Sequence, residues 1–234
     1  MVPASKRVVK RAEVRQDEIL DAAQRLFMIH GYDDTPIQAI IDAVGIAKGT
    51  FYHHYASKPA LLDALVARTV AQSIEVVQPI VADPTLRGVD KLNAVFLRVG
   101  AWKSDHRALL TEMHRALNAE ANAPLLAKVQ RRSTDAIAPI VAEVIAQGVA
   151  EGDFDTPFPA EAAEIVLALG VILGRSIGDA LLADEVKAPD VVAIRRGLEA
   201  YHDGVTRVLG AKPGSIHLVD IDSVMVWFTS AVRA

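Results

Sequence analysis

A short stretch of the sequence, residues 48–58, concentrates side chains that can donate hydrogen bonds or carry positive charge. Phe51 and Tyr55 stand four positions apart, so a helix there buries one narrow apolar stripe. The remaining positions supply donors, a cation, aromatic rings and one residue without a side chain: Lys48, Gly49, Thr50, Tyr52, His53 and His54. A short helix is therefore predicted over about 48–54, and its polar surface suits a polar partner.

A second helix is predicted just before it. Apolar residues recur at helical spacing at Ile37, Ile40, Ile41 and Val44. Thr35 is expected to cap this helix through its hydroxyl, with Pro36 in the first turn and Gln38 at the position of a capping box. Gly45 is expected to end it, because glycine readily adopts the left-handed conformation. The two helices and the glycine turn predict a helix-turn-helix motif.

The sequence around this motif resembles the N-terminal DNA-binding domain of the TetR family of transcriptional repressors. The resemblance is strong over roughly residues 15–65 and covers the rest of the chain only in architecture. It rests on the unbroken spacing of Ile19-Leu20, Ala22-Ala23, Leu26-Phe27, Gly31-Tyr32, Thr35, Val44-Gly45-Ile46, the segment 48–55, Ser57-Lys58 and Leu61-Leu62. Ile41-Asp42 and Pro59 depart from the usual pattern. The resemblance implies an all-α protein in which a three-helix DNA-binding domain precedes a larger helical domain for ligand binding and dimerisation.

Side-chain chemistry and the resemblance together suggest roles for the residues of the motif. The expected phosphate contacts are Thr35, Tyr52, His54 and Lys58. The expected base-reading residues are Lys48, Thr50 and His53. Gly49 would let the helix approach the DNA closely. A capping or packing role is the alternative for Thr35, Tyr52 and Lys58, and Phe51 and Tyr55 are expected in the core.

Charge is distributed unevenly along the chain. The net charge is −4, which argues against nucleic-acid binding over the whole surface. The first fifteen residues nevertheless contain one acid, Glu13, and the basic residues Lys6, Arg7, Lys10, Arg11 and Arg15. Two interpretations of this arm stay open: it is solvated and disordered, or it becomes ordered on DNA. The absence of cysteine excludes disulfides and thiol catalysis.

Three regions are predicted: a flexible basic arm over 1–14, a helix-turn-helix domain over 15–62, and a helical effector-binding and dimerisation domain over 63–234. Helices are expected at about 15–30, 58–81, 85–103, 106–118, 124–150, 160–183, 189–209 and 220–232. Ser57 should cap the helix that starts near Lys58, and Pro79 could end that helix early. This helix would link the two domains. Pro139 should kink the longest helix.

A dimer seam is predicted in the last third of the chain. Gly170, Gly174 and Gly178 recur every fourth residue, at a cost of roughly 1 kcal/mol each in helix stability. Such a row either permits tight packing within one subunit or lets a helix of a second subunit come close. The next helix carries an apolar stripe formed by Ile194, Leu198, Tyr201 and Val205. The resemblance favours a homodimer through these two helices.

The effector site is less clearly marked. Apolar residues that could line a cavity between helices are Phe96, Val99, Trp102, Met113, Leu117 and Val141, with His114 as a possible polar contact. The alternative is that they simply fill the core. No pair of metal ligands stands at the right helical spacing, so no metal site and no cofactor are expected. The effector would be a small, largely apolar molecule.

The function predicted from these observations is sequence-specific regulation of transcription. A homodimer would bind a double-stranded palindromic operator, and an effector would release it by shifting the link helix. The alternatives are an activator, an effector-independent DNA-binding protein and, with less support, a helical enzyme, for which no phosphate loop or nucleophile motif is present. The longest apolar run, 165–174, is too short to span a bilayer, so we expect a soluble, cytoplasmic protein without membrane contact.

Overall fold

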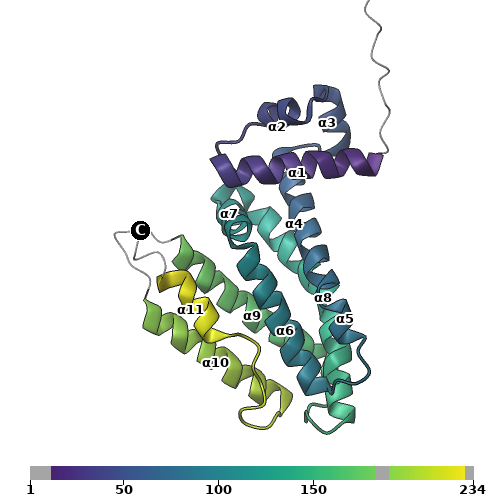
Figure 1. The fold of residues 1–234 in the computed structure, drawn as a ribbon, viewed down its shortest axis with the longest axis vertical. Coiled ribbons are helices and arrows are strands. Elements are labelled where there is room, and N and C mark those ends of the chain that lie inside the picture. Colours follow the sequence, from purple (N-terminus) through teal and green to yellow (C-terminus); the bar gives the residue numbers. More distant parts are fainter. Residues whose placement is uncertain (1–11, 183–189, 230–234) are drawn as a thin grey trace, which may run out of the picture. The chain divides into compact units, whose positions relative to one another are not determined.

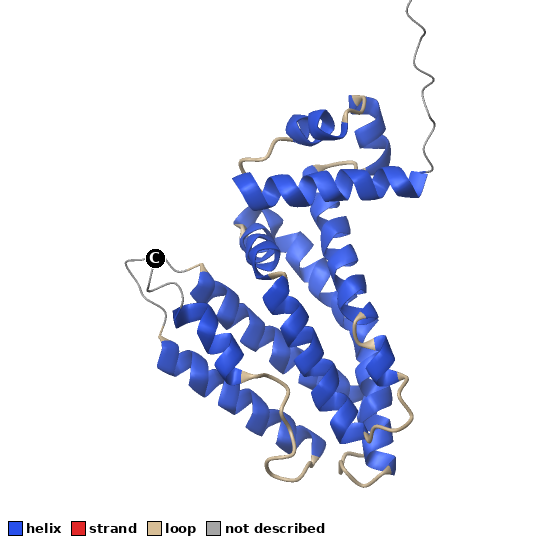
Figure 2. Cartoon of the chain, viewed as in Figure 1, coloured by secondary structure: helices blue, strands red, loops and turns tan. Residues whose placement is uncertain are grey.

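The computed structural model describes residues 12–182 and 190–229, and every described element is helical (Figures 1 and 2). The chain divides into two compact units, residues 1–66 and 67–234. The predicted basic arm lies outside the described residues up to position 11. Along the described chain, no helix is both long and apolar enough to cross a bilayer.

The first unit contains α1 (Ala12–His30), α2 (Ile37–Val44), α3 (Lys48–His54) and the beginning of α4 (Lys58–Glu75). Its core combines residues at helical spacing from all four helices, including Ile19, Phe27, Ile40, Phe51 and Leu61. α1 packs along α2, and Phe27 meets Tyr32 edge-to-face with ring centroids 5.2 Å apart. This small core fixes α2 and α3 relative to α1.

The helix that starts at Lys58 is shorter than predicted. Ser57 caps it as expected, since its Oγ accepts a hydrogen bond from the Ala60 N–H at 3.2 Å. α4 ends at Glu75, and a separate turn, α5 (Gln78–Val81), follows. Glu75 stands four residues before Pro79, which has no N–H to donate and whose ring clashes with the carbonyl in that position. The division between the two units falls within α4.

The second unit is built on α6 (Gly88–Asp105), α7 (Arg107–Asn118), α8 (Ala123–Ala150), α9 (Pro159–Leu181), α10 (Val191–Leu209) and α11 (Ile221–Thr229). A short 3₁₀ turn, Glu120–Asn122, precedes α8, which contains Pro139. α8 packs against both α6 and α9, and α9 packs against α10. A Cβ built at Gly88 would lie 2.3 Å from the Gly148 nitrogen, so α6 and α8 touch through their backbones.

The connection between α10 and α11 is fastened to the helical core. The Asn93 amide donates to the Ser215 carbonyl and accepts from the His217 N–H, each at 2.8 Å. His202 accepts the Val219 N–H on Nε2 at 3.0 Å. Between these bonds, Ile216 and Leu218 enter the same buried cluster as Leu92, Val166 and Val205. A smaller cluster holds α11 through Val224, Met225 and Phe228, together with Leu198 of α10.

Candidate nucleic-acid interface

The turn between α2 and α3 is set by Gly45. Its φ of 70° is left-handed, and its N–H bonds to the Ile41 carbonyl at 2.9 Å. The Ile46 N–H reaches the same carbonyl at 3.2 Å, which completes the end of α2. α3 has the predicted bounds and Gly45 ends α2 as predicted, although α2 begins only at Ile37. The helix-turn-helix motif is confirmed.

Aromatic side chains anchor the inner side of α3. Phe51 is fully buried and Tyr55 nearly so, as predicted. The Phe51 ring lies 6.1 Å from the Tyr55 ring and 5.4 Å from the Tyr52 ring. With only seven residues, α3 would be marginal in water by itself, so this anchoring keeps it helical.

The opposite side of α3 is open within the first unit. Lys48, Gly49 and His53 are exposed, Tyr52 is 44% exposed, and Thr50 and His54 are half-buried. The Lys48 ammonium lies 6.0 Å from the centre of the Tyr52 ring. The His53 and His54 rings meet edge-to-face at 5.3 Å. Partial burial lowers the pKa of His54, and the neighbouring His53 and Arg15 act in the same direction.

Lys58, at the first position of α4, is held by the loop after α1. Its ammonium stands over the Tyr32 ring at 4.4 Å and donates to the Asp33 carbonyl at 3.2 Å. Burial lowers the pKa of Lys58, whereas Asp33 and Asp34 oppose that shift. An ammonium has three donors, so this bond leaves others for a phosphate.

Thr35 has the packing role that the sequence left open as an alternative to a phosphate contact. Its side chain is 0% exposed, and its hydroxyl donates to the Gly31 carbonyl at 2.7 Å. The residue before α2 is Pro36, with no side-chain cap, and Gln38 donates to Asp42 instead of closing a capping box. The prediction of a helix cap is therefore wrong, and Thr35 is a tie between α1 and α2 rather than an available phosphate ligand.

The residues predicted to line an effector cavity lie within the packed helices of the second unit. Val141 belongs to a buried cluster, and the partly buried Phe96 packs against that cluster. Trp102 is buried and stacks on His106 with ring centroids 4.3 Å apart, and Val99 is half-buried. Leu117 is buried. The structure places these residues on α6, α7 and α8.

Two other predicted effector contacts have partners inside the unit. Met113 accepts the Thr69 hydroxyl on its sulfur at 3.8 Å. His114 bonds to Asp179 of α9 through Nε2 at 2.9 Å and lies near the Asn118 amide. These contacts favour the packing alternative for the two residues.

The predicted dimer stripe is used inside the subunit, which corrects that prediction. Leu198 and Val205 are 0% exposed and Tyr201 is also buried, in clusters with α9 and α11, and Ile194 packs beside them. Apolar burial inside the chain leaves these side chains unavailable to a second copy.

The glycine row on α9 likewise serves internal packing. A Cβ on Gly178 would lie 2.6 Å from the His114 ring, and one on Gly170 would lie 3.3 Å from the Tyr201 hydroxyl. Gly174 alone has open space around it, and it is exposed. Tight packing within one subunit, the alternative that the sequence left open, explains Gly170 and Gly178.

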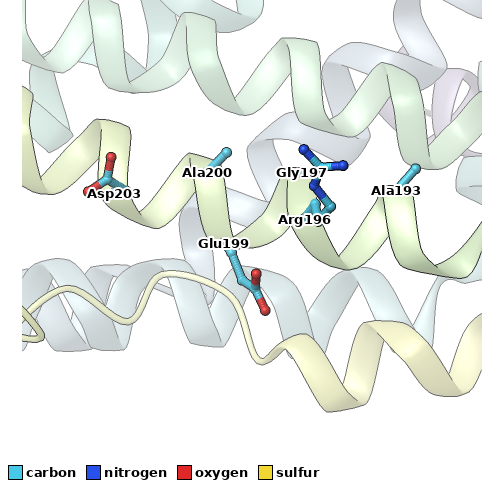
Figure 3. A pocket seen from close by; sticks show the side chains of 6 residues that line it. All are labelled: Ala193, Arg196, Gly197, Glu199, Ala200 and Asp203. Carbon is cyan, nitrogen blue, oxygen red and sulfur yellow. The ribbon is translucent and has the colours of Figure 1, made fainter.

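α9 and α10 each carry exposed residues to which the sequence patterns assigned no role. On α9 these include Ile165, Val171 and Ile172, the last 65% exposed. On α10 a shallow groove is lined by Ala193, Arg196, Gly197, Glu199, Ala200 and Asp203 (Figure 3). The spacing of Ala193, Gly197 and Ala200 was the available sequence signal for this face. We call these α9 and α10 residues together the outer face.

Comparisons with known proteins match both units. A family model for bacterial regulatory proteins of the tetR family matches residues 19–65, and one for the tetracyclin repressor-like C-terminal domain matches residues 108–174. The chain belongs to the TetR family. As a TetR-family protein with this motif, it is a DNA-binding transcriptional regulator.

Relatives of this TetR-family chain include two curated repressors. The HTH-type transcriptional repressor KstR2 of Mycobacterium tuberculosis is 27% identical over 148 residues, which are 63% of this chain and 73% of KstR2. The repressor AcnR of Corynebacterium diphtheriae is 36% identical over 72 residues, 30% of this chain and 38% of AcnR. The AcnR match thus spans little more than a third of that protein.

A solved structure supports the fold along most of the chain. SmeT of Stenotrophomonas maltophilia, in a complex with triclosan, superposes with a TM-score of 0.61 at 22% sequence identity. The match covers 87% of this chain and 94% of SmeT. The all-α architecture of a helix-turn-helix domain followed by a larger helical domain is confirmed.

Proposed function

We propose that this TetR-family regulator is a repressor that binds a palindromic operator as a homodimer and leaves it when a small molecule binds the second unit. The observation that carries the proposal is the contrast between the two sides of α3. Its inner side is anchored by Phe51 and Tyr55, while its outer side exposes Lys48, Gly49 and His53. A rigid, donor-rich helix of this kind fits the major groove, whose floor presents acceptors.

Around α3, Tyr52, His54 and Lys58 are the proposed phosphate contacts. Tyr52 and Lys58 present a phenol and an ammonium, and His54 lies half-buried next to Arg15 of α1. Phosphate contacts fix the position of the protein on DNA, whereas base contacts specify the sequence. Lys48, Thr50 and His53 remain the candidates for base contacts, and Thr35 is withdrawn because its hydroxyl is bonded internally.

The partner proposed for the outer face is a second copy of the chain. A two-fold axis brings the same surface together from both subunits, so the surface must complement itself. The groove on α10 suits this requirement, because its lining includes the basic Arg196 and the acidic Glu199 and Asp203, and its small residues Ala193, Gly197 and Ala200 would allow close approach. A dimer would carry two α3 helices, as two half-sites require.

Effector release is proposed through α4, which begins in the first unit and ends in the second. A ligand that favours one arrangement of the second unit changes operator affinity only if it binds the two states with different affinities. The fold of SmeT holds triclosan, which makes a largely apolar small molecule the first class to test. Operator DNA would be met in the cytoplasm, which is therefore the proposed location.

The deciding experiment is footprinting of the purified full-length chain on the DNA that flanks its own gene. Protection of a palindrome at moderate salt supports the regulator, and its loss with triclosan or another apolar compound supports effector release. Binding without sequence preference, together with a monomer in light scattering, would contradict the proposal. An in-vivo reporter on the protected promoter separates repression from activation.

A further inference from the structure

One side chain lies at the outermost position of α3. Successive helical residues are rotated by about 100°, so His53 lies roughly opposite both Phe51 and Tyr55. Those two rings are buried in the core of the first unit, so His53 points directly away from that core.

Gly49 stands one turn before His53 on the same line. A Cβ built at Gly49 would have nothing within 4 Å, so no neighbour in the protein demands a glycine there. The φ angle of Gly49 is not in the left-handed region either, so its backbone conformation does not require glycine. A glycine in a helix costs about 1 kcal/mol relative to alanine. Because Gly49 has no side chain, another molecular surface can approach this side of α3 closely next to His53.

The other polar residues of α3 lie to the sides of this line. Lys48 and Tyr52 form one flank, where the ammonium is already directed to the aromatic ring at 6.0 Å. Thr50 and His54, both half-buried, form the other flank, and His54 is close to Arg15. When a helix lies in a groove, its outermost line comes closest to the base edges, and its flanks lie nearer to the two phosphate backbones.

We propose that His53 determines operator specificity by donating an imidazole N–H to N7 of a guanine, once in each half-site. The proposal rests on the proposed function as a DNA-binding dimer. Guanine is the base whose major-groove edge offers two neighbouring acceptors, N7 and O6, and no donor. The other bases suit an imidazole donor less well. Cytosine presents an amino group, which is itself a donor, and thymine presents a methyl group beside its O4. Adenine has the same N7 acceptor as guanine, but an amino group stands next to it in place of O6.

The test begins with selection of an operator from random duplex DNA by the full-length chain. Each guanine of the selected half-site is then replaced, one position at a time, by 7-deazaguanine, which lacks the N7 acceptor. At one symmetric position this replacement should weaken binding by the wild type about tenfold. The same replacement should weaken DNA binding by the His53→Ala variant less than twofold, because this variant already lacks the imidazole donor. Equal losses in both proteins at every position would overturn the assignment.

Two further variants sharpen the result. His53→Gln should change the preferred base at that position from guanine to adenine, because an amide pairs with adenine N6 and N7. His30→Ala removes an exposed histidine at the end of α1 and should keep the wild-type response to 7-deazaguanine. Far-UV circular dichroism verifies that the variants fold. If selection enriches no sequence, the proposed function itself fails; if it enriches an operator but His53 shows no coupling, only this inference fails.

Discussion

The inner side of α3 and the inner side of α10 carry similar apolar stripes, yet they differ in what sequence alone could say about them. On α3, Phe51 and Tyr55 are buried in a small core, and the polar outer side is the surface proposed for function. On α10, the stripe that was predicted to meet a second subunit is buried within its own. An apolar stripe requires a partner but does not say which one, whereas a polar face on a short helix indicates that nothing internal covers it.

The largest expected effect is a loss of stability when one buried residue of either apolar stripe is truncated. Phe51→Ala and Leu198→Ala each remove a fully buried side chain, so each should lower the free energy of unfolding by about 2–5 kcal/mol. Urea denaturation measures both. If Leu198 instead met a second subunit, Leu198→Ala would lower the stability in a way that depends on protein concentration, and the comparison would fail.

The outer face offers the complementary variant. Ile172→Asp places a charge on an exposed apolar position, so it should leave the fold intact and weaken the proposed dimer about tenfold or more. Sedimentation equilibrium measures the association. Val226→Asp is the matched control, because Val226 is also exposed but lies on α11, which contributes no residue to the outer face. Equal association of both variants and the wild type would exclude this face as the seam.

A smaller effect separates the structural role of Thr35 from the DNA-contacting role of Tyr52. Thr35→Val removes the hydroxyl that bonds to Gly31 and should cost about 1 kcal/mol of stability without changing operator affinity well below the melting temperature. Tyr52→Ala should weaken binding to all sequences and change the salt dependence only slightly, since a neutral phenol releases no counterion. Gel shifts at several salt concentrations compare the two. The reverse pattern would restore Thr35 as a contact.

The smallest effect concerns His202, which accepts the Val219 N–H. Burial lowers the pKa of His202, and His217 adds to this effect, so the folded protein resists protonation there. The contribution of His202 is therefore complete above its unfolded pKa of about 6.5 and is lost as the pH falls below that value. His202→Gln keeps an acceptor that does not titrate. The urea midpoint of the wild type should thus fall relative to this variant between pH 8 and pH 5.5, and parallel midpoints would contradict the assignment.

The sequence predicted the local parts of this molecule well because their causes are local. Gly45 ends α2 through its own backbone freedom, and Ser57 caps α4 through a bond to a residue three positions away. Thr35 was misassigned because its hydroxyl has a choice of acceptors, and the one it uses is the Gly31 carbonyl behind it rather than the amides ahead. The glycines of α9 depended on Tyr201 and His114, which are distant in sequence, so their role could not be inferred from spacing.

The link between α10 and α11 received no role from the sequence, but its fastening limits how the second unit can move. The Asn93 side chain forms hydrogen bonds with the backbone on both sides of Ile216, and His202 accepts a hydrogen bond from the Val219 N–H. Rotation of α6 about its axis would break both Asn93 hydrogen bonds and pull Ile216 out of the buried cluster. This segment thereby couples α6 to α10. A conformational change that rotates one of these helices must either move the other or break these hydrogen bonds.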